Sequence, residues 1–165
     1  CSQSRGLGDV YKRQAARAAQ AHCQRQEPDG HTRLTRDETL VALHTDASTS
    51  PHAKAFWQHT GLGASSRQAA VALRRESAPA PATAEAARTA VRQRLAAIHG
   101  IEAHRISLHP AGMAGLHAAL SAIQSLKPNR PTLQLGFPYV DVLKQPQVVF
   151  HGGELLQGNL SLIHI

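Results

Sequence analysis

The sequence predicts an α/β fold in which a helix connects two parallel strands. Short segments of strand composition occupy residues 106–109, 132–136 and 148–150. The helix expected over residues 113–126 carries an apolar stripe at helical spacing, formed by Met113, Leu116, Leu120 and Ile123. A strand, a helix and a strand with short connections make a right-handed crossover unit of a parallel sheet. The second half of the chain therefore carries the strongest fold signal.

A second helix is predicted just before this unit. The stretch at 78–81 (Ala-Pro-Ala-Pro) is typical of a linker, and Thr83 is a suitable N-cap. One helical face is then formed by Ala87, Val91, Leu95 and Ile98. Gly100 is placed to end this helix. Beyond the strand at 132–136, we expect a short helical turn through Leu143.

The first half of the chain has weaker patterning. Residues 15–26 have high helix propensity but little apolar face, and residues 27–30 (Glu-Pro-Asp-Gly) form a turn signal. The pattern at 32–60 is irregular, which predicts an extended arm rather than a packed unit. A short helix is expected after Ser65 and Ser66.

Composition limits the class of protein. The chain has 165 residues, 42% of them hydrophobic, which suits one domain or a piece of a larger one. No apolar run approaches the roughly 18–20 residues that span a bilayer. Two cysteines are too few for a disulfide scaffold, so we expect a cytoplasmic protein.

The net charge of +7 raises the alternative of a basic, non-catalytic fragment that binds nucleic acid. The basic residues are scattered, however, and aromatic residues make up only 4% of the chain. Stacking rings interleaved with basic patches are therefore missing, and we expect no nucleic-acid partner.

Both ends of the chain have unusual sequences. Residues 1–14 (CSQSRGLGDVYKRQ) and 160–165 (LSLIHI) resemble translated sequencing-adapter read-through, and the only methionine is Met113. We therefore expect artefactual tails on an internal fragment. Between the tails we expect an N-terminal arm with a helix at 15–64 and part of a larger domain at 65–159.

The turn before the helix at 113–126 is a candidate anion site. Ligands of open α/β sheets lie beyond the carboxyl ends of the strands, and phosphates bind at helix N-termini. The backbone N–H groups of Gly112 and Met113 have no intrahelical acceptor there, and Gly112 has no Cβ to block an anion. The next strand brings Tyr139 to the same edge, where its ring is placed to lie against a planar ligand. A glycine at such a turn also fits plain turn chemistry.

Three segments resemble one known family. The segments at 109–114 (HPAGMA) and 136–141 (GFPYVD) resemble the pyridoxal-phosphate-dependent enzymes of cysteine and methionine metabolism. The segment at 56–61 (FWQHTG), running into Ser65-Ser66-Arg67, resembles the cystathionine gamma-synthase-like group, particularly its branch best known from fungi. The similarity covers roughly residues 36–155.

The resemblance implies part of the large domain of a fold-type-I transferase with an extended N-terminal arm, active as dimers within tetramers. It implies that the amides of Gly112 and Met113 bind the phosphate of pyridoxal 5′-phosphate and that Tyr139 stacks on the pyridine ring. It also implies that Arg67 reaches across the dimer interface to the neighbour's phosphate. Ala111 stands where the family usually has a hydroxyl residue, so that side-chain hydrogen bond is lost.

The activity implied is trans-sulfuration in methionine biosynthesis. The reaction is γ-replacement on an activated homoserine with cysteine, or a related lyase reaction on an amino-acid substrate. In this family the Schiff-base lysine, and the aspartate that pairs with the pyridine nitrogen, lie downstream of the matched region. Lys144 follows Tyr139 too closely to replace that lysine and is expected at the surface. We therefore expect no catalytic residue in this chain, which alone should be inactive.

Other motifs are weaker. The histidines His44, His52 and His59 lack metal-ligand spacing, so no metal is expected. The glycines at 61 and 63 resemble half of a dinucleotide-binding loop, but no strand is predicted before them. Cys23 is expected to be a free structural thiol.

Overall fold

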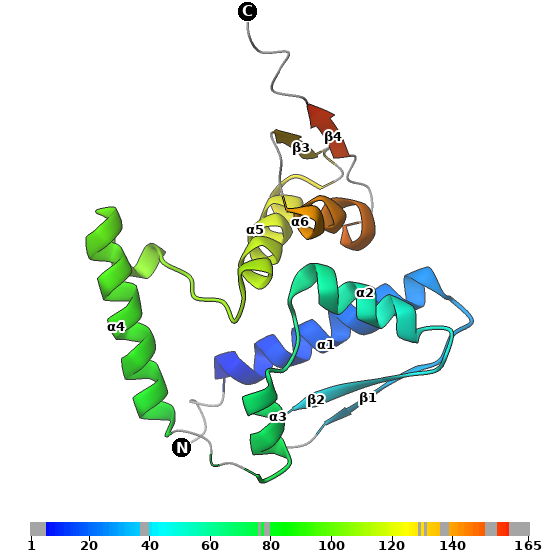
Figure 1. The fold of residues 1–165 in the computed structure, drawn as a ribbon, viewed down its shortest axis with the longest axis horizontal. Coiled ribbons are helices and arrows are strands. Elements are labelled where there is room, and N and C mark those ends of the chain that lie inside the picture. The colour runs from blue at the N-terminus through cyan, green and yellow to red at the C-terminus, as the bar shows by residue number, and fades with distance from the viewer. Residues whose placement is uncertain are drawn as a thin grey trace, which may run out of the picture.

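The computed structural model describes residues 6–36, 40–75, 77, 80–128, 130, 132–135, 139–150 and 155–158. Its elements, in chain order, are α1 (Gly6–Gln26), β1 (Thr32–Arg36), β2 (Val41–Thr45), α2 (Ser50–Thr60), α3 (Ser66–Ala72), α4 (Pro81–His99), the short 3-10 helix η1 (Ala103–Arg105), α5 (Gly112–Leu126), β3 (Thr132–Leu135), α6 (Val140–Lys144), the π-helical segment η2 (Gln145–Val149) and β4 (Leu155–Gly158). The described strands form two small sheets among predominating helices (Figure 1). A mixed α and β structure is thus confirmed at this coarse level.

The first unit consists of α1, an antiparallel hairpin and α2. Strands β1 and β2 pair from Thr32 opposite Thr45 to Arg36 opposite Val41, and α1 packs against both strands and against α2 (Figure 1). The prediction of an unpacked arm at 32–60 is therefore wrong. Strand β1 contains a single large apolar residue, Leu34, so its alternation was too weak to indicate a hairpin.

Asp46 organises the connection from the hairpin to α2. Its Oδ2 accepts a hydrogen bond from the His31 N–H at 2.7 Å, and its Oδ1 accepts one from the Thr49 N–H at 2.9 Å. The Thr49 and Ser48 hydroxyls donate to the same carboxylate. These bonds, led by the one from His31, hold the pKa of Asp46 far below its usual range. The carboxylate thereby joins the start of the hairpin to the start of α2.

A row of rings joins the first unit to the second half of the chain. The rings of His22 and Phe56 lie 5.5 Å apart, those of Phe56 and His117 lie 6.2 Å apart, and those of His117 and Phe150 stack at 5.1 Å. These residues come from α1, α2, α5 and the residue after η2. Phe56 is almost completely buried, so the row forms the centre of the described core.

The second half of the chain contains α5 and a parallel strand pair. Helix α5 is confirmed at Gly112–Leu126, and the strand predicted at 132–136 is confirmed as β3 over its described residues. Strand β3 pairs in parallel with β4, from Thr132 opposite Leu155 to Leu135 opposite Gly158. The chain passes from β3 to β4 through α6 and η2, and the short helix expected through Leu143 is confirmed as α6.

Two predicted strands are wrong. Residues 106–109 are irregular chain before α5, without a strand partner among the described residues. The β-branched residues at 148–149 belong to η2, where the Phe150 N–H donates to the Gln145 carbonyl at 3.1 Å. Both segments have strand composition, but a strand also needs a neighbour to receive its backbone hydrogen bonds.

Helix α4 stands apart from the ring core, at one side of the molecule in Figure 1. Its predicted end is confirmed, since Gly100 adopts the left-handed conformation with φ +63° and donates to the Ala96 carbonyl. The N-cap prediction is wrong: Ala80 occupies that position and Pro81 the first turn, so Thr83 lies inside the helix. Val91 and Ile98, two members of its predicted apolar stripe, remain exposed.

Among the described helices, none combines the length and apolar character required to cross a bilayer.

Candidate functional site

The first turn of α5 is open toward solvent. Ala111 is its N-cap in an extended conformation, and the first bond of the helix runs from the Gly115 N–H to the Ala111 carbonyl at 3.1 Å. The N–H groups of Gly112 and Met113 precede that bond and so lack an intrahelical acceptor. A Cβ built on Gly112 would meet no heavy atom within 4 Å. This end of the helix therefore has room for an anion beside unpaired donors.

The end of α2 packs directly against this turn. Gly61 is left-handed, with φ +64°, and its N–H donates to the Trp57 carbonyl at 2.9 Å. A Cβ at Gly61 would lie 3.0 Å from the nitrogen of Ala114 and 3.0 Å from the Cβ of Met113. Both its conformation and this close approach require glycine.

A hydrogen-bonded cluster lies where α2 meets α6. The Asp141 carboxylate is nearly buried, and its Oδ1 lies 3.0 Å from Nδ1 of His59 and 3.5 Å from Nε2 of Gln58. Interaction with the nearby Tyr139 hydroxyl, followed by that with His59, lowers the pKa of Asp141. The carboxylate in turn raises the pKa of the Tyr139 hydroxyl.

A second contact fixes α5 against the segment that follows α6. Gln145 is fully buried, and its Nε2 donates to the Met113 carbonyl at 3.3 Å. Met113 is thus held by Gln145 on its carbonyl and by Gly61 at its side chain. The first turn of α5 is a fixed element.

The predicted site residues fall into two groups. Gly112 and Met113 lie in the first turn of α5, and Tyr139 is connected to this region through Asp141 and His59. Tyr139 is the residue before α6, and its side chain is 64% exposed, so its ring has an open surface. Arg67 is exposed on α3, and no hydrogen bond or ion pair among the described residues joins it to the other three.

Helix α3 has a well-formed start. Ser65 accepts from the Gln68 N–H, and the Gln68 side chain accepts from the Ser65 N–H, which together form a capping box. The short helix expected after Ser65 and Ser66 is confirmed. The capping box holds the first turn that carries Arg67.

Three polar residues of the site were not predicted as such. His59, Asp141 and Gln145 have burial and partners that depend on distant parts of the chain. His59 and Asp141 are 82 positions apart in the sequence, so no local spacing indicates their pairing. The only sequence signal was that both lie within the segments that carry the family resemblance.

The structure also places the weaker motifs. The glycines at 61 and 63 follow the helix α2 instead of a strand, which excludes a dinucleotide-binding turn there. Within the described part of the chain, no group of three or more histidine, cysteine or acidic residues is arranged to hold a metal ion. Lys144 is exposed at the end of α6, and Cys23 is a buried free thiol.

The fold and site thus define a mixed α and β protein in which the end of α2 contacts both the start of α5 and, through an aspartate–histidine pair, α6. Comparisons with protein-family models, with curated proteins and with solved structures found no match to this chain.

Proposed function

We propose that this chain is part of a pyridoxal-phosphate-dependent enzyme of the trans-sulfuration type, and that the first turn of α5 receives the phosphate of the cofactor. One observation carries the proposal. The segments at 56–61, 109–114 and 139–141, which carry the family resemblance, come together in space. Gly61 lies against the start of α5, and His59 bonds to Asp141.

The first turn of α5 fits a phosphate. The N–H groups of Gly112 and Met113, which have no acceptor among the described residues, and the open space at Gly112 suit a tetrahedral anion. No acidic residue lies in this turn to repel the anion. The helix dipole adds roughly 0.3–1 kcal/mol in favour of a negative charge there. The missing hydroxyl at Ala111 leaves backbone amides as the donors.

Tyr139 fits a ring-covering role. Its exposed ring is available to a planar ligand, and its hydroxyl interacts with the Asp141 carboxylate, which raises the pKa of the hydroxyl. Asp141 is in turn bonded to His59 and Gln58 from the last turn of α2. Tyr139 therefore directly precedes a helix that is fixed to the end of α2.

When bound, the cofactor supplies an electron sink that stabilises negative charge on a substrate carbon. The residues of this chain bind and orient: the amides of α5 hold the phosphate, and Tyr139 covers the ring. The Schiff-base lysine implied by the resemblance lies outside the matched region, and Lys144 is a surface residue. We propose that this chain binds the cofactor but does not catalyse turnover, and that Arg67 serves a phosphate in a partner subunit.

Binding of pyridoxamine 5′-phosphate tests the phosphate role. This amine form cannot react with lysines, so its fluorescence reports non-covalent binding alone. We expect it to bind at least about tenfold more tightly than pyridoxamine, since only the former presents an anion to α5. Gly112→Val should remove this difference because the added side chain occupies the open space. Equal affinity of the two compounds for the unmodified chain would refute the proposal.

Two controls separate local from general effects. Ala82→Val places the same side chain in the exposed first turn of α4 and should leave binding unchanged. Tyr139→Phe keeps the ring and removes its hydroxyl, whereas Tyr139→Ala removes the ring. If the ring covers the ligand, the alanine variant loses affinity and the phenylalanine variant retains most of it. Equal losses in the two variants would exclude stacking by Tyr139.

The nucleic-acid alternative remains a second proposal. On α4, Arg88 and Arg92 both pair with Glu85, at 2.8 Å and 3.3 Å. This pairing reduces the charge that these two arginines would offer to a phosphate backbone.

A further inference from the structure

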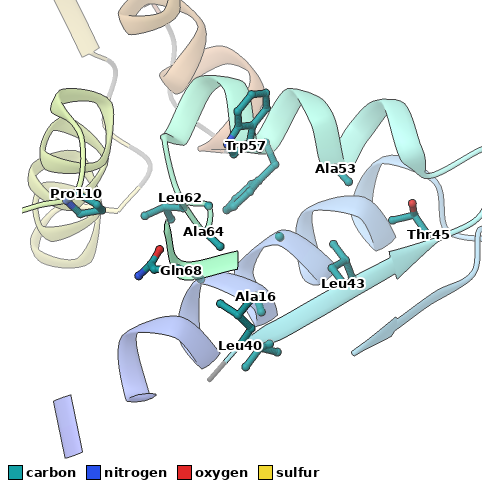
Figure 2. Close-up of a pocket in the computed structure, with 15 residues that line it drawn as sticks. Ala16, Leu40, Leu43, Thr45, Ala53, Trp57, Leu62, Ala64, Gln68 and Pro110 are labelled. Atoms are coloured by element: carbon teal, nitrogen blue, oxygen red, sulfur yellow. The ribbon is translucent and has the colours of Figure 1, made fainter. Parts of the chain in front are cut away.

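An apolar pocket lies between the first unit and the loop that follows α2. Fifteen described residues line it, and its volume is about 480 Å³ (Figure 2). Helix α1, strand β2, helix α2 and the loop leading to α3 all contribute, as the labelled Ala16, Leu43, Ala53 and Leu62 show (Figure 2). Pockets of roughly 300–1,000 Å³ with predominantly apolar walls are typical of small-molecule sites.

The side chains that line the pocket favour a ligand without charge. The chain carries 18 Lys+Arg, 11 Asp+Glu and 11 His, yet none of the fifteen lining residues has an ionisable side chain. A charged molecule would lose its hydration in this pocket without gaining an opposite charge. Polar side chains among the fifteen are limited to Thr45, Gln68 and the indole N–H of Trp57. The pocket therefore suits an uncharged molecule.

Trp57 gives the pocket an aromatic wall. A Cβ on Gly63 would lie 2.6 Å from Cδ1 and 2.7 Å from Nε1 of Trp57, so the loop backbone packs against the edge of the indole. The indole is nevertheless 56% exposed, which leaves part of its surface available. Phe56, from the same helix, adds a second ring to the lining. Contact between two aromatic rings is more favourable than the apolar area that it buries would predict. These rings therefore favour a ligand that carries an aromatic ring.

We propose that this pocket binds a small, uncharged, apolar molecule that contains an aromatic ring. The proposal is independent of the cofactor role of α5, because neither Gly112 nor Tyr139 lines the pocket. Its basis is the combination of volume, apolar walls, absence of charge among the fifteen described lining residues, and an indole that lies against Gly63.

A matched pair of fluorescent probes tests the charge selectivity. N-phenyl-1-naphthylamine is uncharged, and 1-anilinonaphthalene-8-sulfonate is the same ring system with an added sulfonate. Non-specific attraction to a chain of net charge +7 would favour the anion. We expect the opposite: one naphthylamine molecule per chain, bound at least about tenfold more tightly than the sulfonate. Trp57 is the only tryptophan, so energy transfer from it reports binding at this pocket.

Variants with larger side chains in the pocket provide a second test of the proposal. Ala53→Leu should weaken naphthylamine binding about tenfold because the larger side chain occupies the cavity. Ala16→Leu, from the opposite wall, should do the same if the first variant unfolds, as judged by circular dichroism. Ala87→Leu on the exposed face of α4 is the matched control and should bind like the unmodified chain.

Three outcomes would overturn the proposal. Equal binding of both probes, or several probe molecules per chain, would mean general adsorption to apolar surface. Unchanged affinity in folded Ala53→Leu and Ala16→Leu variants would place the probe elsewhere. A Trp57 emission that shifts with protein concentration in the absence of probe, with a dimer in sedimentation, would assign the pocket to a second copy of the chain.

Discussion

The Nδ1 atom of His59 lies 3.0 Å from Oδ1 of Asp141, and this bond joins the last turn of α2 to the first turn of α6. Both side chains are 12% exposed, so solvent screens the pair only partly. The Tyr139 hydroxyl and the Gln58 amide complete the environment of the carboxylate. The arrangement matches a common way of orienting an imidazole, in which a carboxylate receives the Nδ1 proton and leaves Nε2 available.

Asp141→Asn should lower the stability of the chain at neutral pH. The pKa of Asp141 is depressed in the folded state, so its contribution is present above the ordinary carboxyl pKa of about 4 and is lost as the pH falls through the folded value. The urea midpoint of the variant should therefore lie below that of the unmodified chain at pH 7, and the two should converge in acid. Asp29→Asn, in the exposed turn after α1, is the control and should change little. A constant difference from neutral to acid pH would contradict the pairing.

Gly61→Ala and Gly100→Ala separate backbone strain from close packing. Both glycines are left-handed, with φ +64° and +63°, but only Gly61 has neighbours where a Cβ would stand. Gly100→Ala should cost roughly 1–2 kcal/mol of unfolding free energy, from conformation alone. Gly61→Ala should cost about 1–3 kcal/mol more, because its Cβ meets Met113 and Ala114 in α5. Equal losses in urea unfolding would show that α2 and α5 are not in close contact.

His117 should make stability depend on pH near neutrality. Burial lowers its pKa, so the folded state favours the neutral ring between Phe56 and Phe150. As the pH falls below the ordinary value of about 6.5, the unfolded chain takes up the proton first and stability decreases. His117→Phe should flatten the dependence of the urea midpoint on pH between about 7 and 5. His104→Gln, at an exposed position, should leave the slope unchanged, and the same slope in both variants would exclude His117 as its source.

Cys23 should be unreactive until the chain unfolds. Its thiol is fully buried, its Sγ lies 3.9 Å from the Thr49 carbonyl oxygen, and burial raises its pKa. In a Cys1→Ser variant, a disulfide reagent such as Ellman's should react at least about tenfold more slowly in buffer than in concentrated urea. Similar rates in the two solvents would mean that this thiol is not buried between α1 and the rest of the first unit in solution.

The helices were largely predictable from the sequence because their signals are local. The stripe from Met113 to Ile123 and the glycine at 100 predicted α5 and the end of α4, and the pair Ser65-Ser66 predicted the start of α3. The same local signals failed at residues 148–149, where β-branched composition indicated a strand. There the chain continues as η2, since its backbone bonds are satisfied within the turn.

The candidate site was predictable only in part. Gly112 and Met113 could be placed at a helix start because helix boundaries follow from nearby residues. The partners of that helix start could not, since Gly61 and Gln145 reach Met113 from more than 30 positions away on either side. Arg67 was predicted from the resemblance alone and remains a prediction.

The sequence by itself determined that this chain mixes helices with short strands, that a helix begins near Met113 after a glycine turn, and that Cys23 has no partner motif. The tertiary structure alone decided that residues 32–36 pair with residues 41–45, that His59 meets Asp141, and that a pocket lined by uncharged residues forms beside Trp57. The physical reason is the sequence separation of the contacting residues. Helix starts and turns depend on contacts within a few residues. Strand pairing, buried ion pairs and pockets depend on segments that only folding brings together.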